Sequence, residues 1–222
     1  MRYIEREITK VIEKASKTFP VIMVTGPRQA GKTTALVHID PNRRFVTLDD
    51  LEIRFLAQND PKTFLERFPP PVLIDEFQYA PQILTYIKIA VDKQRMRLKP
   101  AGGSYWLTGS QHFSMMTGVQ ESLAGRVCVL NLLGLSRKEI ENNLEFTDDF
   151  LLKPAGSFQT DRNITENLER LIVGDKPELW ANKNIDRETY YNSYVQTYIE
   201  RDVVSYLKIK DIGLFEKFLR LL

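Results

Sequence analysis

The sequence predicts an α/β fold in which a mainly parallel, five-stranded sheet is followed by a mostly helical C-terminal region. Short apolar segments alternate with segments of helical periodicity over residues 1–135, which is typical of a parallel sheet covered by helices on both faces. A glycine-rich motif joins the first apolar segment to the helix after it, and two adjacent carboxylates follow a third apolar segment. Ligands of such sheets bind at the carboxyl ends of the strands, where both features are expected.

The predicted elements follow one another in a regular order. The first is an amphipathic helix over residues 3–17, whose apolar side chains at positions 4, 8, 11, 12 and 15 fall on one face. Strands are expected at residues 21–25, 44–48, 72–75, 105–108 and 126–132. Helices are expected at residues 34–37, 51–58, 61–68, 83–92 and 110–124, the last with a break near Gly118. No clear strand lies in residues 136–187, and a longer helix is expected at 188–208.

The glycine-rich motif reads Gly-Pro-Arg-Gln-Ala-Gly-Lys-Thr at residues 26–33. This is the pattern G-x-x-x-x-G-K-T of a phosphate-binding loop, set between a strand and a helix as the motif requires. Successive backbone N–H groups in such a turn form a concave site for negative charge, and the following helix adds its free amides and dipole. The predicted nucleotide-binding residues are Gly26, Pro27, Arg28, Gln29, Ala30, Gly31, Lys32, Thr33 and Thr34.

Individual residues of the loop have distinct predicted roles. Gly26 and Gly31 permit positive φ and a close approach of the backbone. Pro27 has no N–H group, so the amides that bind phosphate are expected to be those of residues 29–33. Lys32 is expected to reach the β- and γ-phosphates of a nucleotide, and the Thr33 hydroxyl is expected to bind Mg²⁺.

The carboxylates that end the third strand are Asp75 and Glu76. An acidic residue at the end of an apolar strand, well after a phosphate-binding loop, indicates a Walker B aspartate, so Asp75 is expected to hold Mg²⁺ beside Thr33. Glu76 is then placed to polarise an attacking water as the general base. The alternative is a pair of carboxylates at a helix N-terminus, which is a common arrangement.

Three further polar residues are candidates for the same site. Ser110 follows the fourth strand, where its hydroxyl is expected either to sense the γ-phosphate or to cap a helix. Arg126 begins the fifth strand and is expected either to reach the nucleotide of a neighbouring subunit or to form a structural salt bridge. Arg28, inside the loop, is another cation, with a solvated side chain as the alternative. The candidate catalytic residues are thus Glu76, Lys32, Arg126 and Ser110.

The composition narrows the class of protein. The 31 basic and 29 acidic side chains give a net charge of +2, which indicates neither a nucleic-acid nor a membrane partner. The charged N-terminus is unlike a signal peptide, and no apolar run approaches the roughly 20 residues that span a bilayer, so a cytoplasmic protein is expected. Cys128 and two histidines offer no Cys/His metal cluster. The basic run at residues 93–99 predicts a solvated loop, with contact to a phosphate backbone as the alternative.

Taken together, the motifs resemble those of prokaryotic AAA-type ATPases that carry a C-terminal domain of unknown function. They read Gly-Pro-Arg-Gln-Ala-Gly-Lys-Thr-Thr at 26–34, Leu-Asp-Asp at 48–50, Ile-Asp-Glu-Phe-Gln-Tyr-Ala-Pro at 74–81, Leu-Thr-Gly-Ser-Gln at 107–111, Glu-Ser-Leu-Ala-Gly-Arg at 121–126 and Tyr-Ile-Glu-Arg-Asp-Val at 198–203. The last of these resembles the start of the second domain. The resemblance covers nearly the whole chain.

This resemblance implies an AAA-like P-loop fold with an additional strand, in which the strand carrying Thr108 lies between those carrying the loop and Asp75. It implies an ATPase core at residues 1–135 and the start of a second, helical domain at 136–222. Members of the family are about twice as long, so the chain is expected to be a truncated form. Lys32, Thr33, Asp75 and Glu76 carry over as nucleotide and Mg²⁺ residues, with Ser110 and Arg126 after them.

The function expected from these features is Mg²⁺-dependent binding and hydrolysis of ATP by an AAA-like switch or remodelling ATPase. A homo-oligomer and a DNA or protein target are both compatible with this expectation, and no membrane partner is expected. The alternative is a nucleic-acid-binding regulator in which ATP sets the conformation. A small-molecule kinase is disfavoured, because Glu76 suits activation of water and no arginine-rich lid stands out in the sequence.

Overall fold

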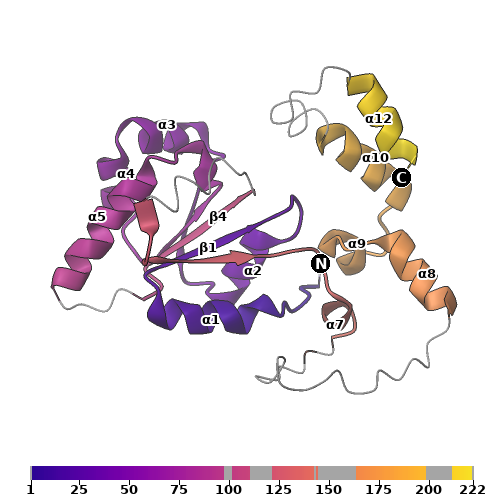
Figure 1. The fold of residues 1–222 in the computed structure, drawn as a ribbon, viewed down its shortest axis with the longest axis horizontal. Helices are drawn as coiled ribbons and strands as arrows, with labels where there is room; N and C mark the ends of the chain where they lie inside the picture. Colours follow the sequence, from indigo (N-terminus) through magenta and orange to yellow (C-terminus); the bar gives the residue numbers. More distant parts are fainter. Residues whose placement is uncertain are drawn as a thin grey trace.

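A computed structural model gives the fold of the chain (Figure 1), and it describes residues 2–97, 102–110, 122–142, 144, 164–198 and 212–221. Five strands form one sheet in the order β2-β3-β4-β1-β5, and each neighbouring pair is parallel. The strands are β1 (Val21–Gly26), β2 (Arg44–Thr47), β3 (Val72–Asp75), β4 (Tyr105–Ser110) and β5 (Val127–Asn131). The predicted α/β fold is therefore confirmed, including the place of the strand that carries Thr108, between β1 and β3.

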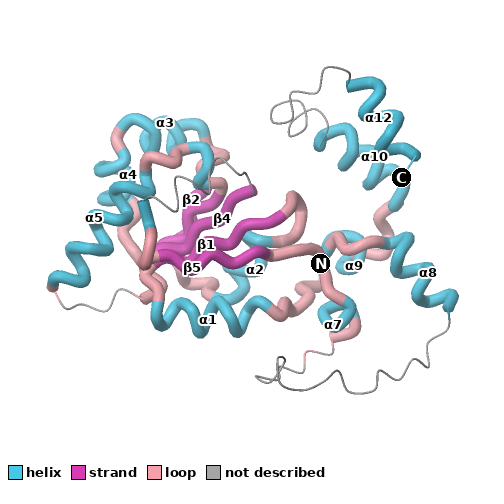
Figure 2. Tube along the Cα trace, in the orientation of Figure 1, coloured by secondary structure: helices cyan, strands magenta, loops and turns pink. Residues whose placement is uncertain are grey.

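Helices cover both faces of the sheet (Figure 2). Helices α1 (Ile8–Thr18) and α2 (Lys32–Ile39) lie on one face, while α3 (Leu51–Asn59), α4 (Pro61–Arg67) and α5 (Ile83–Met96) lie on the other. A short 3-10 helix, η1 (Phe77–Tyr79), follows β3. The C-terminal region contributes α7 (Arg137–Ile140), α8 (Ile164–Val173), α9 (Pro177–Ala181), α10 (Arg187–Tyr198) and α12 (Ile212–Leu221), and it is mostly helical as predicted.

The side chains of β1 explain why helices pack on both faces of the sheet. Val21 and Met23 are buried in the core beneath α3, α4 and α5. Ile22 and Val24 are buried in the core beneath α1 and α2. Because successive side chains of a strand point to opposite faces, a strand that is apolar throughout requires an apolar partner on each side.

The N-terminal helix begins later than the sequence predicts. Helix α1 begins at Ile8, not at residue 3, and Val11 of the predicted apolar face is 49% exposed while Ile12 is fully buried. The residues just before α1 are hydrogen-bonded to Glu139 of α7. The Arg6 guanidinium donates through Nε to Glu139 Oε1 at 2.9 Å, and the backbone N–H of Glu7 donates to the same oxygen at 2.8 Å. These contacts to a carboxylate far along the chain replace the predicted first turns.

Helix α5 ends later than predicted and changes the interpretation of the basic run. It continues to Met96, so Lys93 and Arg95 lie in its last turn and are exposed there. The prediction of a loop over this part of the run is therefore wrong. Positive side chains are favourable at this position, because the carboxyl end of a helix carries a partial negative charge. Lys99, at the end of the run, lies outside the described residues.

Two other predicted helices fall partly outside the described residues. Strand β4 continues to Ser110, so this residue ends a strand where a helix start was predicted, because it pairs with Gly26 of β1. Residues 111–121, which include the predicted break at Gly118, are not among those described. Helix α10 covers the first part of the helix predicted at 188–208, and the rest lies outside the described residues.

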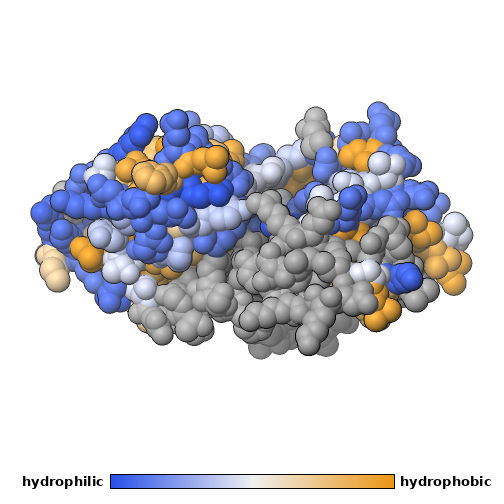
Figure 3. Space-filling view, turned by 90° about the horizontal axis from the view of Figure 1, so that it is seen from above, coloured by the Kyte–Doolittle hydropathy of each residue, from blue (hydrophilic) through white to orange (hydrophobic). Residues whose placement is uncertain are grey.

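The C-terminal helices leave apolar side chains at the surface. On α8 they recur with helical spacing on one face (Ile164, Leu168, Leu171 and Ile172), and on α12 they include Leu214 and Phe218. Figure 3 shows hydrophobic residues exposed at the end of the molecule formed by these helices. Within the part of the chain that the structure describes, no helix combines the length and the hydropathy needed to cross a bilayer.

The ion pair between Arg6 and Glu139 gives a testable prediction about stability. Their side chains are both 4% exposed, so Arg6→Met leaves a buried carboxylate without its cation. We expect the free energy of unfolding, measured by urea denaturation, to fall by about 3 kcal/mol or more. The control is Lys62→Met, which breaks an exposed pair with Glu66 and should leave stability nearly unchanged. Equal effects of the two substitutions would contradict the structural role given to Arg6.

Candidate nucleotide-binding site

The glycine-rich loop runs from the end of β1 to the start of α2 at the carboxyl edge of the sheet. Both of its glycines have positive φ, 147° at Gly26 and 83° at Gly31, and Gln29 between them has φ 58°. A Cβ added to Gly26 would lie 2.0 Å from the carbonyl oxygen of Leu132, so only glycine allows this approach. Gly31 is the N-cap of α2, which directs the free amides of the first helical turn toward the loop.

The side chain of Lys32 folds back onto the loop. Its Nζ donates to the carbonyl oxygens of Gly26 at 3.0 Å and of Pro27 at 2.8 Å. Burial lowers the pKa of Lys32 from its ordinary value, and the carboxylates of Glu76 and Asp75 oppose this effect. The ammonium group is thus held by neutral carbonyl groups, which a phosphate group can replace with charged oxygens.

The carboxylate of Asp75 is bound by hydroxyl groups from three elements. Thr33 of α2 donates to its Oδ1 at 2.7 Å, and Thr108 of β4 donates to the same oxygen. Thr47 of β2 donates to Oδ2 at 3.5 Å. The two residues predicted to hold Mg²⁺, Thr33 and Asp75, therefore lie side by side, and the neighbouring strands fix the direction of the carboxylate.

Glu76 lies at the turn after β3 with a left-handed backbone, φ 54° and ψ 39°. It is the N-cap residue of η1, so the two carboxylates do lie at a helix N-terminus, as in the alternative, but the Glu76 side chain makes no capping hydrogen bond. Its Oε2 accepts a hydrogen bond from the side-chain amide of Gln78. A left-handed conformation costs a residue with a side chain about 1–2 kcal/mol, and such strain is concentrated at functional sites.

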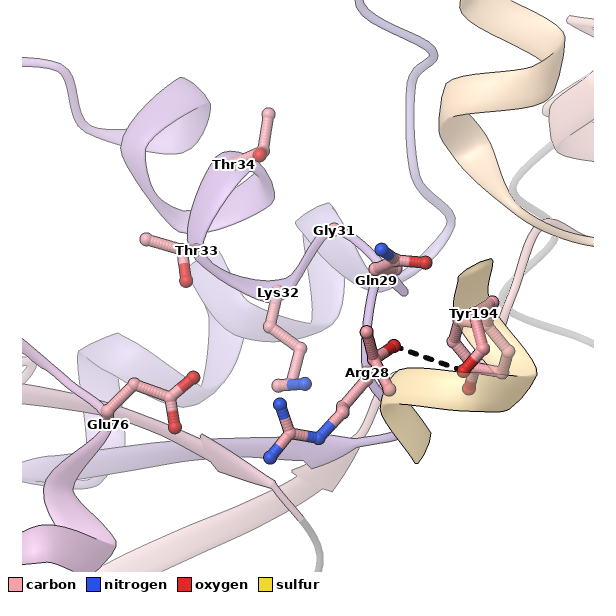
Figure 4. Close-up of a pocket in the computed structure, with 9 residues that line it drawn as sticks. Arg28, Gln29, Gly31, Lys32, Thr33, Thr34, Glu76 and Tyr194 are labelled. Carbon is pink, nitrogen blue, oxygen red and sulfur yellow. Dashed lines mark hydrogen bonds between the residues drawn. The ribbon is translucent and has the colours of Figure 1, made fainter. Parts of the chain in front are cut away.

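Lys32, Thr33 and Glu76 line a cavity of about 300 Å³. Figure 4 shows Lys32, Arg28 and Glu76 pointing into the same space. The residues that line it are Arg28, Gln29, Gly31, Lys32, Thr33, Thr34, Glu76, Tyr194 and Thr197. The predicted nucleotide-binding residues of the loop are consistent with this arrangement. Tyr194 and Thr197 come from α10 and were not predicted.

A second cavity of about 370 Å³ adjoins the loop. It shares Gln29, Gly31 and Thr34 with the first, and its remaining lining comes from the two ends of the chain. Those residues are Arg2, Tyr3, Ile4, Arg6, Pro177, Glu178 and Ala181. Its walls are more apolar than those of the first cavity, and they include Tyr3, Ile4, Pro177 and Ala181.

The C-terminal region contacts the loop directly. Lys176, the N-cap residue of α9, donates through Nζ to the carbonyl oxygen of Arg28 at 3.1 Å. The hydroxyl of Tyr190 on α10 donates to Gln29 Oε1 at 2.8 Å. Sequence reasoning missed both residues, because more than a hundred positions separate them from the loop. The only signal was the recurrence of tyrosine along the predicted helix.

Arg6 was also missed, because the prediction placed it inside the N-terminal helix. Its Nη1 donates to the carbonyl oxygen of Ala30 at 2.6 Å, and its Nη2 donates to those of Leu133 at 2.8 Å and Gly134 at 3.1 Å. One guanidinium thus joins the loop to the segment that follows β5. Arg6 stands between two glutamates in a charged N-terminal segment, where an arginine gives no sequence signal for such a role.

The two remaining candidates lie at opposite edges of the sheet. Ser110 is in register with Gly26 at the edge that carries the loop. Arg126 precedes β5 at the other edge, and it binds Asp92 through Nε at 2.7 Å and Nη2 at 3.0 Å. This hydrogen bond lowers the pKa of Asp92. The structure thus gives Arg126 the salt bridge that was the alternative and separates it from this chain's own loop. Contact with a neighbouring subunit stays a prediction.

Comparison with known protein families identifies the family of the chain. A family model described as an AAA domain matches residues 18–141, which is more than half of the chain. The chain belongs to the AAA-domain family. A second model, a domain of unknown function (DUF8612), matches residues 165–222. The resemblance to AAA-type ATPases with a C-terminal domain of unknown function is therefore confirmed.

Similar proteins share the family and the fold. Uncharacterized proteins of Mycobacterium bovis and Mycobacterium tuberculosis are each 28% identical to the chain over 206 residues. The matches cover 89% of this chain and 39% of each relative, so the chain spans about two fifths of their length. Among solved structures, a Walker-type ATPase of Pyrococcus abyssi has a TM-score of 0.50 at 14% identity, covering 93% of this chain and 75% of that one. This likeness shows the fold alone.

The backbone of Glu76 gives a testable prediction about strain. Glu76→Gly and Glu76→Ala both remove the carboxylate, but only glycine adopts positive φ without strain. We expect the Gly variant to be more stable than the Ala variant by about 1 kcal/mol in urea denaturation, although glycine gains more entropy on unfolding. An Ala variant as stable as the Gly variant would show that the strain in the turn is no larger than the entropy that glycine loses on folding.

Proposed function

We propose that the protein binds ATP with Mg²⁺ at residues 26–34 and hydrolyses the γ-phosphate, as an AAA-like switch or remodelling ATPase. The observation that carries the proposal is that Lys32, Thr33 and Glu76, from two separate strand ends, line one cavity, and that the Asp75 carboxylate accepts a hydrogen bond from Thr33. Membership of the AAA-domain family supports nucleotide binding and an ATPase class of activity.

The loop supplies the groups that bind the phosphates. Backbone amides of residues 29–33 and the first turn of α2 offer N–H donors, and the positive end of the helix dipole adds to their effect. Lys32 is already placed beside these amides, on the carbonyls of Gly26 and Pro27. It exchanges these neutral acceptors for phosphate oxygens when a nucleotide enters.

Thr33 and Asp75 supply the oxygen ligands that Mg²⁺ prefers. Mg²⁺ neutralises part of the phosphate charge when it is bound. In this proposal the hydroxyls of Thr108 and Thr47 keep the Asp75 carboxylate aimed at Thr33, so the two ligands need little rearrangement.

The second cavity suits the nucleobase. It adjoins the loop through Gln29, Gly31 and Thr34, and its apolar walls include Tyr3 and Pro177. A planar base gains from burial against aromatic and aliphatic side chains. We therefore place the base between the N-terminal segment and the start of α9, with the phosphates extending into the first cavity.

Glu76 is the group proposed to activate water. Its carboxylate lines the cavity beside Lys32, and the Gln78 amide holds one of its oxygens. It accepts a proton from a water molecule whose oxygen attacks the γ-phosphorus, while the bond from phosphorus to the oxygen of ADP breaks. The products of this reaction are ADP and inorganic phosphate.

The binding role of Lys32 is tested by Lys32→Ala. We expect Mg²⁺-dependent ATP binding, measured by titration calorimetry, to be abolished, because the variant loses the ammonium group that is hydrogen-bonded to the carbonyls of Gly26 and Pro27. The matched control is Lys62→Ala, which removes an exposed lysine and should bind ATP normally. Wild-type affinity in the Lys32 variant would contradict the proposed function.

The catalytic role of Glu76 is tested by Glu76→Gln, which keeps the shape of the side chain and removes its basicity. We expect ATP affinity to be retained and phosphate release to fall by about 100-fold or more. The control is Glu66→Gln, at an exposed position on α4. Product analysis distinguishes hydrolysis from transfer: free phosphate supports an ATPase, and a phosphorylated acceptor indicates a kinase. Unchanged turnover would exclude Glu76 as the base.

A further inference from the structure

Two buried cations outside the glycine-rich motif contact the backbone of the loop. Arg6 is 3% exposed and donates to the carbonyl oxygen of Ala30 at 2.6 Å. Lys176 is 7% exposed and donates to the carbonyl oxygen of Arg28 at 3.1 Å. They are far apart in the sequence, in the N-terminal segment and before α9, yet they bind carbonyls only two residues apart in the same turn.

The geometry of the peptide group determines what these contacts do. A trans peptide is planar, and its C=O and N–H groups point in opposite directions. The bond from Arg6 to Ala30 therefore turns the N–H of Gly31 away from Arg6. The bond from Lys176 to Arg28 likewise turns the N–H of Gln29 away from Lys176. A carbonyl that accepts a bond from a cation also makes the N–H of its own peptide a stronger donor.

We propose that Arg6 and Lys176 are positioning residues, which hold two peptide groups of the loop so that the N–H groups of Gln29 and Gly31 face the phosphates of the nucleotide. This inference rests on the proposed function, because it assigns a role within the same site. Both amides belong to the group of residues 29–33 that binds phosphate in the proposal. Each acts through the peptide that it holds, and Lys176 lines neither of the two cavities.

Both cations are themselves fixed by neighbours. Glu139 and the carbonyls of Leu133 and Gly134 hold the guanidinium of Arg6. The ammonium of Lys176 donates to the hydroxyl of Tyr194 at 3.3 Å and lies 4.4 Å from the centre of that ring. A cation that is held in place can in turn fix a carbonyl, whereas a solvated lysine would exchange between many positions.

Lys176 provides the cleaner test, because replacing Arg6 also leaves the buried Glu139 carboxylate without its cation. Lys176→Met keeps a chain of similar length and removes the ammonium, while Lys176→Arg retains a cationic donor. We expect Lys176→Met to weaken ATP binding about tenfold in titration calorimetry, as the loss of one charged hydrogen bond predicts. Lys176→Arg should recover most of the affinity. The thermal midpoint of each variant shows that it is folded.

The matched control is Lys183→Met, which removes the same charge from an exposed position in the same region. It should bind ATP like the wild type. If Lys176→Met and Lys183→Met bind equally well, the positioning role is overturned. Should Lys32→Ala lose binding in that same experiment, the proposed function stands without the positioning role.

A second readout needs no nucleotide. In the ¹⁵N spectrum of the free protein, Lys176→Met should shift the backbone amide of Gln29, because that amide belongs to the peptide whose carbonyl loses its partner. Lys183→Met should leave the resonance in place, and Lys176→Arg should return it toward the wild-type position. An unmoved Gln29 amide in Lys176→Met would overturn the inference even if the wild type failed to bind ATP.

Discussion

The hydrogen bond between the Thr33 hydroxyl and the Asp75 carboxylate, at 2.7 Å, joins the two halves of the site. Thr33 belongs to the first turn after the loop, whereas Asp75 ends a strand more than forty residues later. They meet because β4 lies between β1 and β3 and all three strands run in the same direction. The hydroxyl of Thr108 on β4 completes the contact. The strand inserted between the two strand ends is thus part of the chemistry as well as of the fold.

Much of this arrangement could be predicted from local sequence. The strands of the sheet are short and apolar, and their ends carry glycine, hydroxyl or carboxylate groups, so both the fold class and the edge that holds the site follow from pattern. The motif at residues 26–33 has a shape that its glycines dictate, which is why the loop could be described residue by residue before its structure was known.

What could not be predicted depends on contacts between distant segments. Arg6 belongs by periodicity to an amphipathic helix, and only the buried Glu139 explains why the helix begins after it. Lys176 has no neighbours in sequence that mark it, and Arg126 fits a salt bridge and an intersubunit contact equally well until Asp92 is seen beside it. In each case the deciding partner comes from another element. The AAA-domain model covers residues 18–141, and neither Arg6 nor Lys176 lies within it.

The position of Lys32 has a consequence for the range of anions that can enter. Its ammonium group already has two acceptors in the loop, the carbonyl oxygens of Gly26 and Pro27. An incoming anion must compete with them, so entry is an exchange of partners and not the filling of an empty coordination position. Small monovalent ions such as chloride gain little from that exchange, while a polyphosphate offers several charged oxygens at once. In the proposed function, this exchange favours a polyphosphate over small monovalent anions.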